Sequence, residues 1–140
     1  MTMMMSKGRG SGAQKTTIKN KVGILVVLVL VILVCMEYPV DAEATYTVGD
    51  DLGWSIGVFI WPLGKTFQAG DVLVFNYNPL IHNVVKVGKA GYVTCLASPC
   101  AKVYRTGNDS IKLEKGINYF ICTTPGLCLY SRMKIAVLAE

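Results

Sequence analysis

The stretch YFICTTPGLC, residues 119–128, joins an aromatic and aliphatic run to a Pro-Gly turn that lies between two cysteines. A short run of β-branched and aromatic residues that ends at a turn is typical of a β-strand. Similar runs recur after residue 44, where no stretch of ten residues shows helix periodicity with caps at both ends. The predicted strands are Thr45–Val48, Val72–Tyr77, Asn83–Lys86, Ile111–Leu113, Asn118–Cys122 and Lys134–Leu138.

Clusters of Gly, Pro, Asn and Asp separate these runs, as in Gly49-Asp50-Asp51 and Gly107-Asn108-Asp109. Short strands at this spacing in a chain of this size indicate an all-β antiparallel sandwich or barrel. The segment 88–104 is the least regular, and we expect a short helix there.

The first 44 residues are predicted to be a secretory signal peptide. Five Lys or Arg residues within Met1–Lys21 precede an uncharged apolar run, Val22–Met36, which is the order of a signal sequence. The run is shorter than the roughly 20 residues that span a bilayer. Ala42-Glu43-Ala44 supplies the small-x-small cleavage pattern, so we expect the mature chain to begin near Thr45. An uncleaved membrane anchor is the alternative.

The mature domain, residues 45–140, carries nine basic and six acidic side chains. One small domain of this size benefits from a covalent cross-link. The basic residues are scattered singly, which favours a solvated surface over attraction to acidic polysaccharides or membranes. The mature domain has no basic patch with interleaved aromatic residues, so nucleic-acid binding is not predicted. No polar spacer and hydrophobic tail follow the last predicted strand, so a GPI anchor is not predicted. We expect a soluble, secreted, extracellular or apoplastic monomer.

Four cysteines follow the predicted signal peptide, and an oxidising compartment favours their pairing. They are Cys95, Cys100, Cys122 and Cys128. Four cysteines allow three full pairings, and their spacing does not choose among them. The sequon Asn108-Asp109-Ser110 fits the same compartment, and Asn108 is a candidate glycosylation site.

Hydrolytic catalysis has few candidate residues. His82 is the only histidine of the chain, and a Cys122–His82 nucleophile pair has no recognisable orienting acid or oxyanion motif. The acids of the mature domain lie in turns or at the chain end, where they do not form the carboxylate pair of a glycosidase. We therefore predict no enzyme and no catalytic residues.

Three side chains of the soft or borderline type are candidate metal ligands. His82, Cys122 and Met133 are the residue types of a mononuclear blue-copper site, which takes two histidines, a cysteine and a weak axial methionine or glutamine. Each residue also has an ordinary structural explanation, as a turn residue, a half-cystine and a core residue.

The mature chain resembles the phytocyanins, and within them the plantacyanin or basic blue protein branch. The resemblance covers nearly all of residues 45–140 and implies a cupredoxin-like Greek-key β-sandwich. The stretches that carry it are TYTVGDDLGW (45–54), FQAGDVLVFNYNPLIHNVV (67–85), CAKVYRTGNDSIKLEKGINYFIC (100–122) and PGLCLYSRMKIAV (125–137).

This resemblance implies a type 1 copper site with His82 as the first histidine ligand, Cys122 as the thiolate and Met133 as the axial ligand. The family pattern Pro-Gly-His-Cys carries the second histidine, and Leu127 stands at that position here. Plantacyanins place three residues between the half-cystine and the methionine, whereas this chain has four. The resemblance thus implies a copper site that is degenerate.

The family's disulfide implies a Cys95–Cys128 bond, which would stabilise the fold by a few kcal/mol in the chain-entropy model. Cys100 is then an additional cysteine. It could pair with Cys122 in the absence of copper, or replace Cys95 as the partner of Cys128.

Two functions follow from the resemblance. The first is a non-redox cell-wall, signalling or reproductive-development protein, as proposed for early-nodulin-like and plantacyanin-like members. The second is a blue-copper one-electron carrier that uses His82, Cys122 and Met133. The sequence names neither a redox partner nor a cell-wall component.

Overall fold

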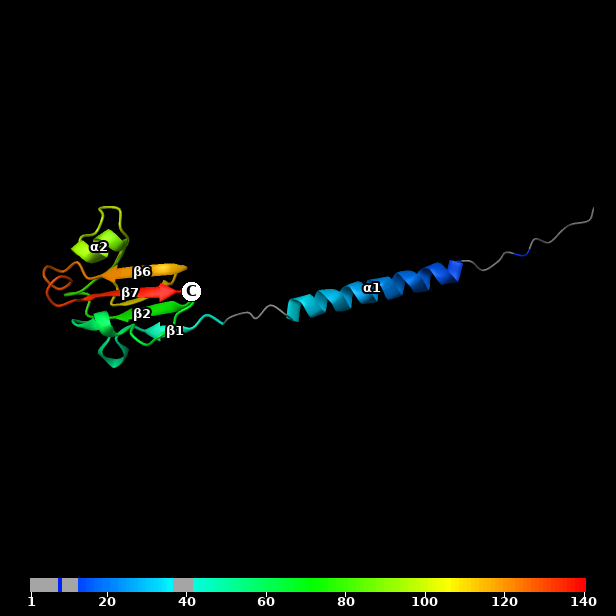
Figure 1. Ribbon diagram of the computed structural model, residues 1–140, viewed down its shortest axis with the longest axis horizontal. Helices are drawn as coiled ribbons and strands as arrows, with labels where there is room; N and C mark the ends of the chain where they lie inside the picture. Colours follow the sequence, from blue (N-terminus) through cyan, green and yellow to red (C-terminus); the bar gives the residue numbers. More distant parts are fainter. Residues whose placement is uncertain (1–7, 9–12, 37–41) are drawn as a thin grey trace, which may run out of the picture. The chain divides into compact units, whose positions relative to one another are not determined.

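The computed structural model describes residue 8, residues 13–36 and residues 42–140 (Figure 1). The chain divides into two compact units, Met1–Asp41 and Ala42–Glu140.

The first unit contains one helix, α1 (Ala13–Met36). Its Lys19–Met36 part has a mean hydropathy of 2.3 and no buried residues, so it is long and apolar enough to cross a membrane. A signal sequence near an N-terminus has the same properties, and the helix is consistent with the predicted signal peptide. Lys7 and Arg9 of the predicted basic segment lie outside the described residues.

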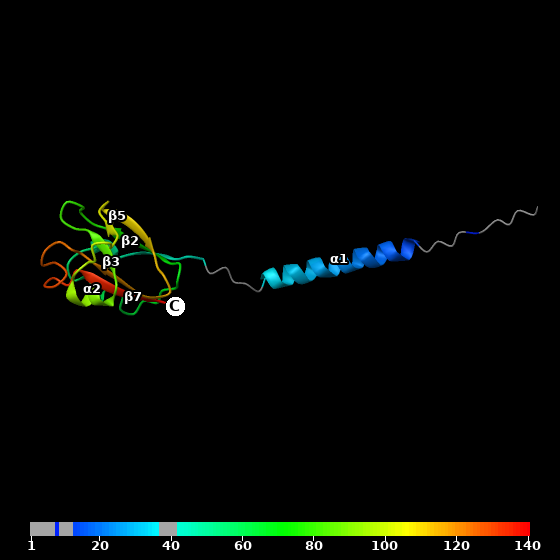
Figure 2. The same ribbon diagram turned by 90° about the horizontal axis from the view of Figure 1, so that it is seen from above.

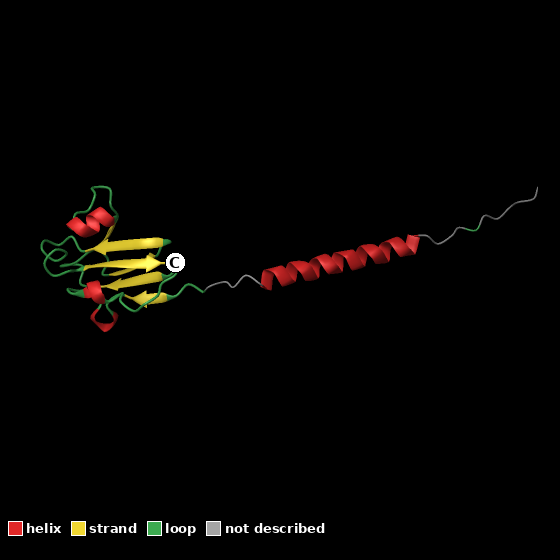
Figure 3. Ribbon diagram, viewed as in Figure 1, coloured by secondary structure: helices red, strands yellow, loops and turns green. Residues whose placement is uncertain are grey.

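The second unit is a sandwich of two β-sheets with short helical segments, as Figures 1 to 3 show. The three-stranded sheet has the order β1-β2-β5 and the four-stranded sheet the order β4-β3-β6-β7. The strands are β1 (Thr45–Thr47), β2 (Val72–Asn76), β3 (Val84–Val87), β4 (Val103–Tyr104), β5 (Asn108–Lys112), β6 (Gly116–Ile121) and β7 (Lys134–Ala139). The short helices are η1 (Asp50–Leu52), η2 (Val58–Ile60) and α2 (Lys89–Thr94).

The all-β prediction is confirmed, and the predicted short helix is α2. Only β1 and β2 pair in parallel, with Thr45 opposite Val72, and the other strand pairs are antiparallel. Strand β5 begins three residues earlier than predicted, because Asn108 and Asp109 pair with β2 although their residue types favour turns.

The main core lies between the two sheets and contains a row of three aromatic rings in contact. The Trp54 and Phe75 ring centroids are 5.2 Å apart, and those of Phe75 and Phe120 are 5.1 Å apart. All three side chains are almost fully buried. Edge and tilted ring pairs of this kind stabilise a core beyond the area they bury.

A second, smaller core lies where the four-stranded sheet meets α2 and the segment after it. It contains Val85, Ile121 and Cys128, with Tyr92 and Cys95 packed against them. Because side chains of a strand alternate between faces, Ile121 enters this second core while its neighbours Phe120 and Cys122 enter the main one.

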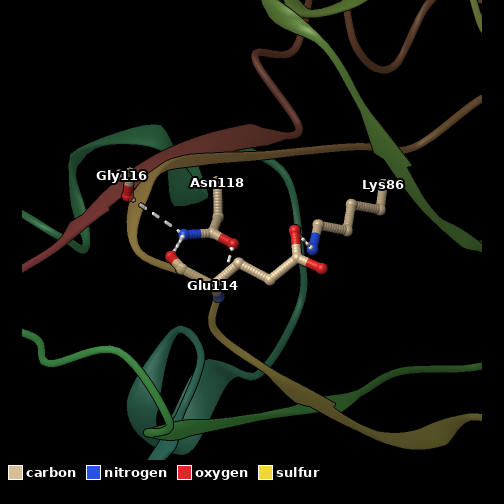
Figure 4. A network of polar contacts seen from close by, with 4 residues as sticks. All are labelled: Lys86, Glu114, Gly116 and Asn118. Carbon is tan, nitrogen blue, oxygen red and sulfur yellow. Dashed lines mark hydrogen bonds and ion pairs between the residues drawn. The ribbon is translucent and has the colours of Figure 1, made fainter.

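The turn between β5 and β6 is closed by one buried side chain, Asn118 (Figure 4). Its amide donates to the carbonyls of Glu114 and Gly116, and its Oδ1 accepts from the Glu114 amide at 3.0 Å. The Glu114 carboxylate pairs with Lys86 Nζ at 2.9 Å. Gly116 at the start of β6 pairs with Ala139 at the end of β7. This turn therefore lies at the end of the sandwich opposite to the loops 77–83 and 122–133.

Candidate metal centre

Two loops meet at one end of the sandwich. The first, residues 77–83, joins β2 to β3, and the second, residues 122–133, joins β6 to β7. Val85 near the start of β3 pairs with Ile121 at the end of β6, so the sheet register brings the two loops side by side. The first loop contains His82, and the second begins with Cys122 and ends with Met133.

His82 is positioned by a turn built on Asn78. The Asn78 side-chain oxygen accepts from the Leu80 amide at 3.0 Å, and its carbonyl accepts from the His82 amide at 3.0 Å. The His82 ring is half-buried, and its Nδ1 atom is buried with no hydrogen-bond partner in the part of the chain that the structure describes. Most buried polar atoms are paired, so an unpaired imidazole nitrogen fits a metal ligand.

Cys122 and Met133 lie next to each other in the main core, and both side chains are fully buried. The Cys122 amide donates to the Met133 carbonyl at 3.1 Å. The Cys122 thiol is not part of a disulfide. A buried free thiol beside a buried thioether supplies the sulfur ligands of a type 1 copper site.

The additional residue before Met133 does not move this methionine out of the core. Arg132 adopts a left-handed conformation, with φ of 49°, and its guanidinium lies over the Phe59 ring at 4.9 Å. Few residues other than glycine adopt this conformation. The backbone reverses there, and the Met133 amide donates to the Leu127 carbonyl at 3.0 Å.

Leu127 is half-buried and packs against the core cluster that contains Cys122 and Met133. Its amide donates to the Thr124 carbonyl at 3.2 Å, which closes a turn over Pro125 and Gly126. An aliphatic side chain at this place contributes no metal ligand.

Asn83 connects the two loops. Its Nδ2 donates to Thr123 Oγ1 at 2.7 Å, and its Oδ1 accepts from the Thr123 amide at 2.8 Å. The Asn83 carbonyl accepts from Trp54 Nε1 at 2.9 Å. Asn83 was not predicted as a site residue from the sequence, and its place directly between His82 and β3 was the only signal.

Tyr77 fixes the start of the first loop. Its hydroxyl donates to the carboxylate of Asp109, a buried residue of β5, and lies 2.9 Å from the Tyr104 carbonyl. Burial, followed by the hydrogen bond to Asp109, raises the pKa of Tyr77 to about 12. The hydroxyl therefore stays protonated and keeps the loop attached to β5 at neutral pH.

The structure contains a disulfide between Cys95 and Cys128, with Cα atoms 5.7 Å apart. It joins the end of α2 to the second loop. Cys100 is a free, exposed cysteine.

Among residues 13–36 and 42–140, no three His, Cys, Asp or Glu side chains lie together in a group able to hold a metal ion. A metal at this end of the sandwich would therefore depend on Met133 in addition to His82 and Cys122. These three residues supply three of the four ligands that a type 1 site takes, and the residues present fit copper only in part.

Comparisons with known proteins agree with this fold. A plastocyanin-like domain matches residues 54–132. Chemocyanin of Lilium longiflorum is 48% identical over 135 residues, which cover 96% of this chain and 99% of that protein. The chain belongs to the phytocyanin family.

Solved phytocyanin structures place the second unit in the same fold. Cucumber basic protein, a blue copper protein, is 55% identical and superimposes with a TM-score of 0.67, covering 69% of this chain and all of that one. Spinach plantacyanin is 47% identical with a TM-score of 0.60 and the same coverage. The second unit of this phytocyanin is therefore a cupredoxin-like β-sandwich, and it corresponds to the whole of both solved chains.

Proposed function

We propose that this phytocyanin is secreted and acts outside the cell as a cell-wall, signalling or reproductive-development protein, with a degenerate type 1 copper site. Blue copper proteins of the family are non-enzymatic electron carriers. The observation that carries the proposal is that the chain has a single histidine, His82. A blue-copper site takes two imidazoles, and this chain cannot supply the second.

Leu127 occupies the place of the missing imidazole in this proposal. Three observations support the assignment: it follows Pro125-Gly126, it packs against the cluster that contains Cys122 and Met133, and its carbonyl accepts from the Met133 amide. His82 Nδ1, the Cys122 sulfur and the Met133 sulfur would hold the metal. Copper, when bound, supplies a one-electron redox couple, and three ligands would hold it more weakly than four.

Exposed apolar side chains at the loop end support a role in contact with another molecule. Leu80 is 91% exposed and Tyr130 is 84% exposed, and Ile81 and Leu129 beside them are more than half exposed. The Thr124 hydroxyl donates to the Ile81 carbonyl at 2.8 Å, which joins the two loops beneath these side chains. Exposed apolar groups gathered on one surface are typical of an interaction site.

The alternative function is a blue-copper one-electron carrier that uses His82, Cys122 and Met133. The buried, unpaired Nδ1 of His82 favours it, because a core that no longer held a metal would gain stability by pairing this atom. An exogenous ligand would then complete the site.

Copper titration of the metal-free second unit distinguishes the two functions. We expect no intense thiolate-to-copper absorption band when Cu(II) is added to the unmodified protein. Leu127→His should produce the band, because it restores the second imidazole, whereas the matched control Leu127→Ala should not. An intense band in the unmodified protein without any supplement would contradict the degenerate site.

Free imidazole provides a second readout. If the pocket is intact and only the ligand is missing, added imidazole should produce the band in Leu127→Ala, where space has been created. No band in either variant under any condition would mean that the loop before Met133 has changed the ligand geometry.

Glycosylation of Asn108 is part of the proposal. Asn108 and Ser110 are exposed on β5, and the side-chain Nδ2 of Asn108 donates to Asn76 Oδ1. Enzymatic release of N-glycans from the secreted protein should lower its mass, and Ser110→Ala should abolish the difference. We expect the deglycosylated protein to elute as a monomer in gel filtration.

A further inference from the structure

The residues just before β1 are part of the folded sandwich. The Ala44 amide donates to Asp71 Oδ1 at 2.9 Å, and the Ala44 carbonyl accepts from the Val72 amide at 2.8 Å. The second of these hydrogen bonds continues the parallel pairing of β1 with β2 beyond Thr45, its first residue. The second compact unit accordingly begins at Ala42.

The burial of Asp71 makes these hydrogen bonds important for stability. Its side chain is 3% exposed, and its second oxygen, Oδ2, accepts from the Gln68 amide at 2.8 Å. A buried carboxylate is costly unless donors surround it. The Ala44 amide is one of two hydrogen-bond donors to the Asp71 carboxylate among the described residues, so removal of Ala44 leaves Oδ1 without its partner.

Glu43 also contacts the sandwich, through an ion pair with Lys112 of β5. Both side chains are more than half exposed, and exposed pairs contribute little to stability. The pair shows that the chain lies against the sheet from Glu43 onward.

We infer that the signal peptide is removed by hydrolysis of the Ala42–Glu43 bond, so that the mature chain begins with Glu43, two residues before Thr45. Signal peptidase requires a small residue before the cut. Ala42 and Ala44 meet this requirement, whereas Glu43 does not; the third residue before the cut is Val40 for the cut after Ala42 and Ala42 for the cut after Ala44. Water adds across the bond and leaves a carboxylate on Ala42 and an ammonium group on Glu43.

The two possible cuts give products that differ in the fold. A cut after Ala44 removes the amide that donates to Asp71 and the carbonyl that accepts from Val72, whereas a cut after Ala42 keeps both. The peptidase acts before the chain folds, so these contacts do not direct it. They decide which product keeps Asp71 paired and accumulates as folded protein. The inference rests on the proposed secretion.

N-terminal sequencing of the secreted protein tests the position of the cut. The full chain would be expressed in a eukaryotic secretory host and purified from the medium. We expect the first residues to be Glu43, Ala44 and Thr45. A secreted protein that begins with Thr45 would overturn the inference and leave secretion intact. A full chain that is retained in the cell membranes and is absent from the medium would contradict the proposed secretion itself.

Ala44→Gln separates the two cuts further, because a long polar side chain before the Thr45 bond blocks that cut only. The variant keeps its backbone amide, so the contact with Asp71 remains. We expect secretion and a Glu43 N-terminus as in the unmodified protein. Loss of processing, or a new N-terminus, would show that the cut lies after Ala44.

Thermal unfolding tests the physical basis. The domain 43–140 should melt about 5–15 °C higher than the domain 45–140, because one buried carboxylate oxygen loses its donor in the shorter chain. Asp71→Asn should reduce this difference, since a neutral amide is less costly to leave unpaired. Equal melting temperatures of the two chains would overturn the argument.

Discussion

His82, Cys122 and Met133 differ in how far they depend on a metal. The two sulfur side chains are fully buried in the main core, where cysteine and methionine pack as ordinary apolar groups. His82 is different, because its buried Nδ1 has no partner among the described residues. The histidine is therefore the residue whose environment would change most if the proposed site held a metal.

Met133 should be important for folding even without copper. We expect Met133→Ala to lower the free energy of unfolding of the metal-free domain by about 2–5 kcal/mol, because it leaves a cavity in the core. Met133→Leu, which conserves volume, should cost less than about 1.5 kcal/mol. Urea unfolding measures both, and equal losses would argue against a packed Met133.

Tyr77 should make the fold sensitive to alkaline pH. Its pKa is raised to about 12 in the folded protein and is about 10 in the unfolded chain. The unfolded chain therefore loses this proton first, and its stabilising effect, present below pH 10, is lost as pH rises through 12.

Tyr77→Phe removes this group while it keeps the ring. The stability difference between the unmodified protein and Tyr77→Phe should shrink from pH 9 toward pH 12, as chemical unfolding at each pH would show. A difference that stays constant would mean that Tyr77 does not titrate in this range.

At the level of single residues, the sequence identified side chains by chemical type and missed those that act through hydrogen bonds. His82, Cys122 and Met133 were predicted as candidate ligands because few residue types bind copper. Asn83 was missed, since an asparagine after a turn is common and only the fold brings it to Thr123.

Among the elements, the two loops are held as one unit by few contacts. Asn83 of the first loop bonds twice to Thr123 of the second, and Thr124 bonds to Ile81. Because the first loop carries His82 and the second carries Cys122, these hydrogen bonds set how the two side chains lie relative to each other.

Asn83→Ala should separate the loops. We expect a loss of about 1–3 kcal/mol of stability, because the Thr123 amide loses its acceptor in a partly buried place. In Leu127→His the same change should also weaken copper binding. Thr123→Val, which removes the hydroxyl but keeps the amide, should have a smaller effect in denaturant titrations. The reverse order would assign the effect to the hydroxyl.

The disulfide between α2 and the second loop should contribute more to stability than the hydrogen bonds of Asn83. Cys95 and Cys128 are 33 residues apart, so their replacement by alanine should cost about 3–4 kcal/mol in the chain-entropy model. Cys100→Ala, at an exposed free cysteine, is the matched control and should change stability by less than about 0.5 kcal/mol. Thermal unfolding under non-reducing conditions compares them.

Most strands of the sandwich were predictable from their apolar and β-branched runs, but the short edge strand β4 and the turn before β7 were not. Strand β4 has only two residues, Val103 and Tyr104, too few to form a pattern. The left-handed turn at Arg132, which returns Met133 to the core, was also not predictable. Nothing in the residue type of an arginine indicates a positive φ.

For the whole molecule, the N-terminal unit and the sandwich differ in the apolar surface that they expose. The Val22–Met36 part of α1 is uncharged and apolar, and none of it is buried. In the sandwich, two of the most exposed large apolar side chains, Leu80 and Tyr130, lie in loops.

Removal of the first unit should therefore change how the protein partitions. The full chain should enter the detergent phase in a Triton X-114 separation, whereas the domain 43–140 should remain in the aqueous phase, because the apolar run Val22–Met36 is removed. A full chain found in the aqueous phase would show that α1 is covered by the rest of the protein.

The two ends of the sandwich domain lie close together, at the end of the sandwich opposite to the loops 77–83 and 122–133. The Ala69 amide donates to the Glu140 carbonyl, and Asp71, two residues later, accepts from the Ala44 amide. Both ends can therefore be attached to a surface, or joined to the flanks of a host loop, without covering His82 or Tyr130. This arrangement makes the domain suitable for insertion into another protein as a single module, with the loops 77–83 and 122–133 left accessible.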